Sequence, residues 1–456
     1  MNEDRADIVV IGSGPAGMAA ACEARTLGLS VVVLDEQQAV GGQIYRSIDT
    51  APADRVEILG ADYAAGQALA DGFRSSGADY RGGATVWNVT TDGVVDYIIG
   101  KQSKTISGRH VVLASGAMER PFPIAGWTLP GVMGAGAAQI LLKSTGAVPK
   151  GPAVLVGCGP LLYLLAWQYL RAGVAISAVV DTTESAGYFR ALPHLVPAIL
   201  GWSDLLKGVK LLTALRRSGV AFYSRARDLA VLGETAVEGL SFVQRGTSKS
   251  LAAGLVLLHQ GVVPNAQLSL STGAKHRWNA AQLCWEPVTD QWGRLGASAL
   301  YVAGDSRGIV GALASAAQGR LAALSAAAEQ GVVSDLARRA LPLQQQLARH
   351  TRIRPFLDAL YRPSLQNRIP LKDDVLVCRC EEVTAGQIRG YVKLGCLGPN
   401  QTKSFGRSGM GPCQGRLCGL TVTEIIARER GVEPGEVGHY RIRPPVKPIL
   451  LGDLVG

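Results

Sequence analysis

Apolar and polar positions along the chain predict alternating strands and helices. A run of β-branched residues at 8–11 predicts a buried strand, and the Ala-rich stretch after it predicts a helix to about Leu27. The same order of strand, turn and helix begins again at 153, and further strands are expected at 31–34 and 176–180. This alternation is typical of α/β domains with parallel sheets.

Length and composition suggest how the chain is divided. Its 456 residues can form about three domains, each large enough to bury a core. With 47% apolar and 18% charged residues, the composition is that of a globular α/β enzyme. We expect a discontinuous first domain, an inserted second domain, a helical linker, a cysteine-bearing domain and a tail. Their predicted ranges are 1–120 with 266–335, 121–265, 336–374, 375–435 and 436–456.

The net charge of +10 changes this picture little, because Lys and Arg are scattered and form no dense run. We therefore expect no nucleic-acid partner. The longest apolar stretches, such as 192–200, are interrupted by Pro or His, so no integral membrane span is predicted. The polar, acidic start of the chain predicts no export signal and hence a cytoplasmic protein, with peripheral membrane contact left open.

The turn at 12–17 has the glycine spacing of a dinucleotide-binding loop. Gly12 permits a tight turn, Gly14 lets a pyrophosphate approach the backbone, and Gly17 lets helix and strand pack closely. The N-terminus of the following helix then faces the phosphates. The next strand leads into Asp35 and Glu36, where an acid can hold a ribose hydroxyl.

The turn at 157–162 departs from this pattern. Its first two glycines are present, but Leu162 takes the third position, where a bulky side chain should separate helix from strand. The next strand ends at Asp181 without an arginine pair that could receive a 2′-phosphate. We therefore expect a degenerate NAD-like domain, with NADP as its least expected occupant and another adenine nucleotide as an alternative.

Four of the eight cysteines cluster near the C-terminus, at Cys378, Cys380, Cys413 and Cys418. Clustered thiolates in a chain without an export signal indicate a metal site rather than disulfides. Four thiolates suit zinc or a [2Fe–2S] cluster. Neither pair has the C-x-x-C spacing usual for zinc, so [2Fe–2S] is favoured. Cys396 stands alone at the end of a predicted helix and is not expected to be a ligand.

Three further stretches resemble the two-dinucleotide flavoprotein superfamily that includes thioredoxin reductase. They are GGQIYR at 41–46, VVLASGA at 111–117 and LYVAGD at 300–305. The resemblance implies FAD in the first domain, with Asp305 on the flavin ribitol and the helix after it facing the isoalloxazine. The residues expected to bind FAD are Gly12, Gly14, Pro15, Ala16, Gly17, Asp35, Glu36, Gly42, Gln43, Arg46, Val86, Ala114, Gly116, Gly304, Asp305 and Ile309.

The spacing of the four cysteines resembles the bacterioferritin-associated ferredoxin-like domain, which holds [2Fe–2S]. Nearly the whole chain resembles the alpha subunit of heteromeric FAD-dependent amine and amino-acid dehydrogenases. That group includes octopine, nopaline, D-hydroxyproline and L-proline dehydrogenases, hydrogen cyanide synthase and sarcosine oxidase. The most specific stretches are 120–121, 126–132, 409–419 and 443–448.

Resemblance to this group implies an electron-transfer subunit without a catalytic residue of its own. The substrate is then oxidised at FAD in a separate beta subunit, with an FMN between the subunits and a small gamma subunit as further expected components. Two alternatives stay open. One is an NADH-dependent flavin reductase that feeds its own cluster, and the other is a redox- or iron-sensing interaction protein. Neither the amine substrate nor the final electron acceptor follows from the sequence.

Overall fold

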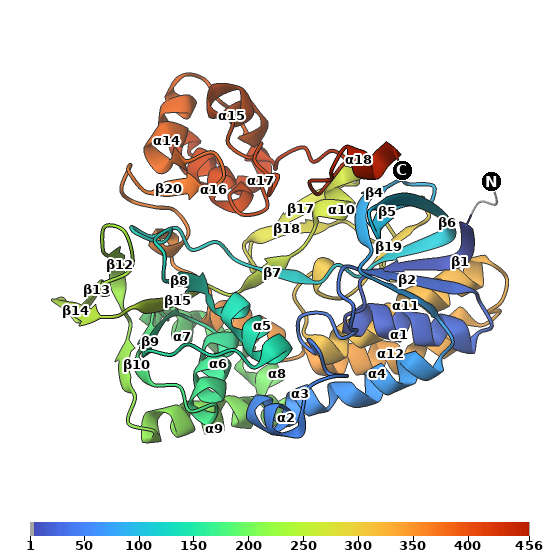
Figure 1. The fold of residues 1–456 in the computed structure, drawn as a ribbon, viewed down its shortest axis with the longest axis horizontal. Coiled ribbons are helices and arrows are strands. Elements are labelled where there is room, and N and C mark those ends of the chain that lie inside the picture. The colour runs from blue at the N-terminus through green and yellow to red at the C-terminus, as the bar shows by residue number, and fades with distance from the viewer. Residues whose placement is uncertain (1–3, 456) are drawn as a thin grey trace.

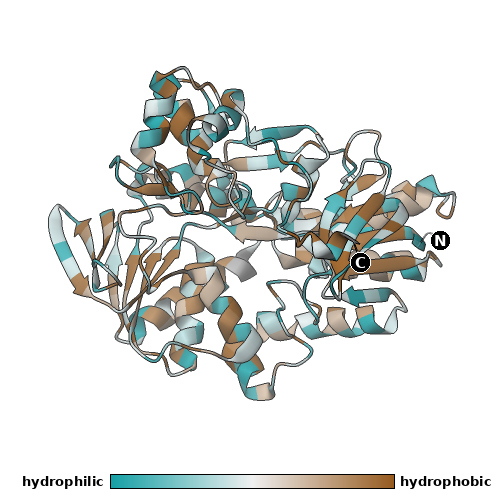
Figure 2. Cartoon of the chain, turned by 45° about the horizontal axis from the view of Figure 1, so that its top comes forward, coloured by the Kyte–Doolittle hydropathy of each residue, from teal (hydrophilic) through white to brown (hydrophobic). Residues whose placement is uncertain are grey.

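The computed structural model describes residues 4–455. The first domain, on the right of Figure 1, is built on a seven-stranded sheet. Its strands are β1 (Asp4–Ile11), β2 (Val31–Asp35), β3 (Asp79–Gly82), β4 (Thr85–Val89), β5 (Val94–Ile99), β6 (Gln102–Leu113) and β19 (Leu300–Val302). Strands β3, β2, β1, β6 and β19 are parallel, while β4 and β5 continue the sheet in antiparallel pairing. Figure 2 shows that these strands are largely apolar.

Helices α1 (Pro15–Thr26) and α11 (Ala312–Glu329) pack on the first sheet, and α4 (Gly66–Ser75) packs against α1. The short helices α2 (Ala53–Leu59) and α3 (Ala61–Ala64) lie toward the inserted domain, where α2 packs against α6 (Pro160–Arg171). Strand β1 continues through the turn into α1, as the sequence predicts, and α1 begins at Pro15 with Gly14 as its N-cap. A short helix, α10 (Gln267–Ser271), and the hairpin of β17 (His276–Asn279) and β18 (Cys284–Pro287) lie beside the sheet toward the C-terminal domain.

The inserted domain has a parallel sheet of five strands in the order β11-β10-β9-β15-β8. Their bounds are β8 (Val132–Gly134), β9 (Ala153–Gly157), β10 (Ile176–Asp181), β11 (Ala221–Ser224) and β15 (Leu255–His259). A second, antiparallel sheet contains β12 (Arg227–Leu232), β13 (Gly239–Gln244) and β14 (Thr247–Ala252). The helices are α5 (Ala135–Thr145), α6 (Pro160–Arg171), α7 (Ser185–Ala191), α8 (Leu195–Ile199) and α9 (Trp202–Arg217). Strands β7 (Ala117–Glu119) and β16 (Val262–Pro264) pair where the chain crosses between the two domains.

The linker is helical, as expected, and leads to the C-terminal domain at the top of Figure 1. Helix α12 (Leu336–Thr351) packs against α11, and α13 (Arg354–Leu360) packs against α7. The C-terminal domain contains β20 (Leu376–Cys378), β21 (Val383–Thr384), α14 (Ala385–Lys393), α15 (Pro399–Gly406), α16 (Gly419–Arg430) and α17 (Pro434–Val437). The chain then returns to the first domain and ends in α18 (Gly452–Val455), beside β6.

The helix boundaries near the cysteines follow the signals in the sequence. The Thr384 hydroxyl accepts the Gln387 backbone N–H at 3.3 Å, and the Gln387 side chain accepts the Thr384 N–H at 2.8 Å. Together these two bonds form a capping box, which starts α14. Helix α16 begins at Gly419, directly after Cys418.

Among residues 4–455, no helix is both long enough and apolar enough to cross a bilayer.

Close packing between α1 and α11 yields a stability prediction. A Cβ at Gly319 in α11 would lie 2.0 Å from the carbonyl oxygen of Ala16 in α1. We expect Gly319→Ala to lower the free energy of unfolding by about 1–3 kcal/mol, because the helices must separate. The control is Gly72→Ala in α4, where a Cβ meets no atom within 4 Å and helix propensity improves by at most about 1 kcal/mol. Denaturant unfolding measures both, and equal effects would contradict the close contact.

Candidate functional site

The glycine turn of the first domain has the geometry of a phosphate-binding loop. Gly12 has φ +102°, and a Cβ there would lie 2.4 Å from the carbonyl oxygen of Ala114. A Cβ at Gly17 would lie 1.8 Å from the Gly12 carbonyl oxygen. At Gly14, in contrast, the nearest atom to a Cβ is the Cα of Gly42 at 3.8 Å. The first and third glycines are thus required by packing, and the second keeps space open at the N-terminus of α1.

The loop at 41–46 lies directly on this turn. The Gly41 N–H donates to the Ser13 carbonyl oxygen at 2.9 Å, and a Cβ at Gly42 would lie 2.8 Å from the Gly14 Cα. The Gln43 side-chain amide donates to the carbonyl oxygen of Ala117 at 3.4 Å. The structure therefore brings Gly14, Gly42 and Gln43 together, as the sequence predicts for one dinucleotide site.

Of the two acidic residues after β2, only Asp35 lies at the turn. Its Oδ2 accepts the Ser13 N–H at 2.6 Å and the Ser13 hydroxyl at 2.7 Å, and its Oδ1 accepts the Gln37 N–H at 2.8 Å. Glu36 instead forms an ion pair with Lys447 of the tail. Of the two candidate acids, Asp35 is therefore the one at the glycine turn, and its contact with a ribose stays a prediction.

Residues expected around the flavin ring meet at the other end of the site. Gly116 has φ +69° and no atom within 4 Å of a Cβ, so it borders open space. A Cβ at Gly304 would lie 2.8 Å from the Ala16 Cβ, which joins this end to the glycine turn. Asp305 Oδ1 accepts the N–H groups of Val310 and Gly311 at 2.8 and 3.0 Å. Asp305 therefore orders the backbone before α11, and its contact with the flavin ribitol stays a prediction.

Two predicted site residues have other structural partners. Ile309 exchanges two hydrogen bonds, each of 3.0 Å, with the side chain of Gln282, a residue that the sequence did not single out. Val86 is buried in the sheet core, and its backbone pairs with Tyr97 across β4 and β5. The backbone N–H of Ile309 is thus already bonded.

The second dinucleotide-like site is filled by its own chain. Cys158, Asp181 and Gln260, at the carboxyl ends of three parallel strands, are all buried. The Cys158 thiol contacts Gln260 Oε1 at 3.4 Å and the Tyr361 carbonyl oxygen at 3.5 Å. The Tyr361 ring lies 6.1 Å from the ring of Tyr163 in α6. The linker thus covers the edge where a nucleotide binds in such sheets.

Hydrogen bonds within the chain also occupy the acid of this second site. Asp181 Oδ1 accepts the Thr183 N–H at 2.8 Å, and burial raises the pKa of its carboxyl. Leu162, in the third glycine position, is completely buried in the core. The structure thus shows which residues occupy this turn, and the degenerate NAD-like character of the domain stays a prediction.

The four predicted cysteine ligands come together as two pairs. A hydrogen bond between Cys378 and Cys418 lowers the pKa of the Cys378 thiol to about 5 and raises the pKa of Cys418 well above its usual value. Burial and the neighbouring Cys413 thiol raise the pKa of Cys380. Across residues 4–455, no three His, Cys, Asp or Glu side chains are arranged to hold a metal ion. Cys396 contacts the Gly398 carbonyl oxygen at 3.3 Å and takes no part in the pairs.

Tyr440 supports the cysteine loop, a role that the sequence did not reveal. Cβ atoms at Gly409 and Gly415 would lie 2.5 and 2.6 Å from its ring, so only glycine fits there. The Tyr440 hydroxyl lies 3.0 Å from the Ser408 hydroxyl and 4.0 Å from the Cys418 thiol. The glycines of the stretch GMGPCQGRLCG thus permit the loop to wrap around one buried aromatic ring.

The tail fastens this loop to the first domain. Gln414 Nε2 donates to the Pro445 carbonyl oxygen at 2.6 Å, and Arg416 donates to the carbonyl oxygen of Val446 at 2.5 Å. The Val446 N–H in turn donates to the Trp87 carbonyl oxygen of β4 at 2.9 Å. The motif at 443–448, noted in the sequence, is therefore a strap between the cysteine loop and the first sheet.

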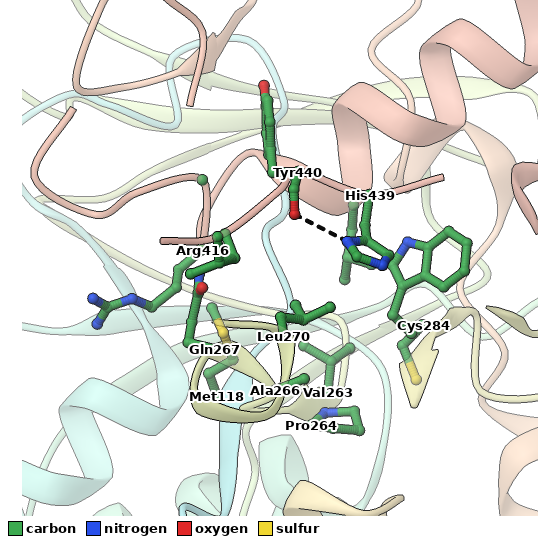
Figure 3. A pocket seen from close by; sticks show the side chains of 15 residues that line it. Met118, Val263, Pro264, Ala266, Gln267, Leu270, Cys284, Arg416, His439 and Tyr440 are labelled. Atoms are coloured by element: carbon green, nitrogen blue, oxygen red, sulfur yellow. Dashed lines mark hydrogen bonds between the residues drawn. The ribbon is translucent and has the colours of Figure 1, made fainter. Parts of the chain in front are cut away.

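A pocket of about 70 Å³ separates the cysteine loop from the first domain (Figure 3). Met118 and Gln267 line it from the first domain, and Arg416, His439 and Tyr440 line it from the C-terminal domain. Gln267 Nε2 donates to the Gln414 carbonyl oxygen at 3.4 Å. Met118 follows Gly116 by two residues, so the pocket lies between the predicted flavin edge and the cysteine loop.

Fold and site together define the class of two-dinucleotide flavoproteins, with a cysteine-bearing domain attached. Residues 6–331 match the model of the pyridine nucleotide-disulphide oxidoreductase family, and residues 373–456 match the sarcosine oxidase A3 domain. The A3 match spans both the predicted cysteine domain and the predicted tail. The solved structure of L-proline dehydrogenase from P. horikoshii has the same fold, with a TM-score of 0.75 at 18% identity, over 100% of this chain and 80% of that one.

Two sequence relatives narrow the class. The A subunit of opine oxidase from Rhizobium meliloti is 47% identical over 98% of this chain and 87% of that protein. Hydrogen cyanide synthase subunit HcnB of Pseudomonas aeruginosa is 30% identical over 97% of this chain and 96% of that protein. The chain belongs to the pyridine nucleotide-disulphide oxidoreductase family and, within it, to the group that contains the opine oxidase A subunits, as the resemblance in its motifs predicts.

The open space at Gly14 yields a test of the first site. Gly14→Val should fold, because the position has φ −71° and no clash within 3.8 Å, but the side chain fills the space for the pyrophosphate. We expect flavin content below about a tenth of the wild-type value with an unchanged circular dichroism spectrum. Gly151→Val, on an exposed loop with nothing within 4 Å, is the control. Stoichiometric FAD in the Gly14 variant would show that this loop does not bind the cofactor.

The filled second site predicts the response to NADH. Tyr361 packs at the carboxyl ends of the parallel strands of this site and Asp181 is buried, so we expect NADH neither to bind tightly nor to reduce the isolated chain quickly. Stopped-flow absorbance at the flavin band measures the rate. Rapid, stoichiometric bleaching by NADH would overturn the interpretation of this site and favour a self-contained flavin reductase.

Proposed function

We propose that the chain is the electron-transfer alpha subunit of a heteromeric dehydrogenase of amino acids, imino acids or opines. FAD occupies the first dinucleotide site, and the four cysteines hold one [2Fe–2S] cluster. A flavin-bearing beta subunit oxidises the substrate. The proposal extends to this chain what the names of its relatives, the A subunits of opine oxidase, say of those proteins.

Adjacency of the two predicted redox sites carries the proposal. The open cradle at Gly14 and Gly116 fits a dinucleotide flavin, and two pairs of thiols fit the two irons of a [2Fe–2S] cluster. The pocket that Met118 and Arg416 line from its two sides lies next to both predicted sites. Bound FAD accepts electrons in pairs and a [2Fe–2S] cluster passes them singly, so such a chain converts between the two modes.

The chain's own residues position these groups and exclude water. Asp35 is placed for the ribose, and Asp305 orders the backbone that leads into α11, whose N-terminus favours negative charge on a reduced ring. Arg416 stands near the Cys413 thiol, and its charge offsets an anionic cluster. The Tyr440 hydroxyl can donate to a Cys418 thiolate. The filled second site disfavours NADH as the electron donor.

Replacement of one thiol tests the cluster. Cys413→Ser should remove the [2Fe–2S] signal from the EPR spectrum of dithionite-reduced protein and loosen the C-terminal domain, because metal binding and folding are coupled in a small unit. FAD, held by residues of another domain, should be retained. The matched control is Cys396→Ser, a buried cysteine outside the two pairs. Zinc in place of iron in anaerobically purified protein, or an unchanged signal in Cys413→Ser, would refute the cluster.

The proposed function is tested directly by asking whether substrate oxidation requires a second subunit. We expect the purified chain alone to leave opines and L-proline unoxidised in the presence of an artificial acceptor. Activity should appear when a flavin-bearing beta subunit is added, and iron should stay with this chain. Turnover by the single, highly purified chain would contradict the assignment of substrate oxidation to a beta subunit.

A further inference from the structure

A buried lysine crosses from the inserted domain into the first dinucleotide site. Lys143 lies in α5 and is only 4% exposed. Its Nζ donates to the carbonyl oxygen of Gln43, in the loop that lies on the glycine turn, at 3.1 Å. Among the side chains that the structure describes, no carboxylate is paired with this ammonium group. A buried charge without a counter-ion is costly, so its position calls for an anionic partner.

The groups around Lys143 add positive charge rather than balance it. Arg46, in the same loop, lowers the pKa of Lys143 further, after burial, to about 7. Arg46 itself has a buried Nε without a hydrogen-bond partner in the described structure. From α2, Arg55 donates to the Lys143 backbone carbonyl oxygen at 3.3 Å, and from α3 the Tyr63 hydroxyl donates to that of Arg46 at 2.8 Å.

The nearest carboxylates face other groups. Burial lowers the pKa of Arg46, and Asp35, which opposes this only in part, is held by Ser13 at the glycine turn. Asp49 forms an ion pair with Arg74. Lys143 and Arg46 thus form a pair of cations at the loop that covers the open space beside Gly14.

We propose that Lys143 and Arg46 bind the diphosphate of the dinucleotide in the first site, so that the ligand bridges the first and inserted domains. The inference rests on the proposed occupancy of that site by FAD. The diphosphate supplies the counter-charge that the protein lacks, and Lys143 takes up a proton as the ligand binds. A further consequence is that the bound dinucleotide restrains the inserted domain from rotating.

The number of protons taken up on FAD binding can be measured by calorimetry, in which the full chain is freed of flavin and titrated with FAD. Titrations at pH 8 in HEPES and in Tris, which differ in ionisation enthalpy, should give an uptake close to one proton. At this pH free Lys143 is mostly neutral, and the diphosphate favours its charged form. At pH 6 the lysine is already protonated, so the uptake should almost vanish. Equal proton counts at the two pH values would overturn the proposal.

Substitutions of Lys143 distinguish an effect of its charge from an effect on the structure. Lys143→Met should weaken FAD binding about tenfold or more and abolish the proton uptake, since a hydrogen bond to a charged group contributes about 1.5–3 kcal/mol. Lys143→Arg, always charged, should keep most of the affinity and also lose the uptake. The control is Lys207→Met, because Lys207 also joins the two domains, through Asp62 at 2.7 Å, but lies away from the loop.

These measurements distinguish failure of the proposed function from failure of the proposed role of Lys143. If the wild-type chain binds no FAD at all, the proposed function fails and this inference with it. If the wild type binds FAD and Lys143→Met binds it with equal affinity and proton count, only the role of Lys143 is wrong. Flavin content of the purified variants, measured by absorbance, checks the same order of affinities without removal of the cofactor.

Discussion

Packing of the cysteine loop on the ring of Tyr440 is the interaction on which the two-site arrangement depends. The ring excludes any side chain at Gly409 and Gly415, and its hydroxyl reaches toward Cys418. The chain after Tyr440 continues into the strap at 443–448, which forms hydrogen bonds with the cysteine loop and with β4. One buried aromatic residue therefore fixes both the shape of the cysteine loop and its position against the first domain.

The glycine turns at 12–17 and 157–162 are similar in sequence, but the first borders open space and the second is covered by another part of the chain. At the first turn, glycines on two facing loops keep a volume free beside the helix N-terminus. At the second, a linker segment from far along the chain supplies Tyr361 and closes the edge of the sheet. The glycine motif specifies the local backbone in both cases, but access to the turn is decided by what packs above it.

Features set by the local sequence could be predicted, whereas features set by distant parts of the chain could not. Strands, helix starts and the capping box at Thr384 follow local rules and were predictable. The choice between Asp35 and Glu36 was not, because it depends on a tail residue, Lys447, that is distant in sequence. Lys143 gave a weak signal, a lone lysine in an apolar helix, but its placement at the loop of another domain depends on tertiary packing.

The central claim is that electrons pass between flavin and cluster inside this chain, across the pocket beside Met118. Rapid freeze-quench EPR on the complete complex, mixed with its substrate, tests it most directly. The account predicts that the signal of the reduced [2Fe–2S] cluster grows at least as fast as steady-state turnover. A cluster signal that is absent, or that appears many times more slowly than turnover, would contradict it.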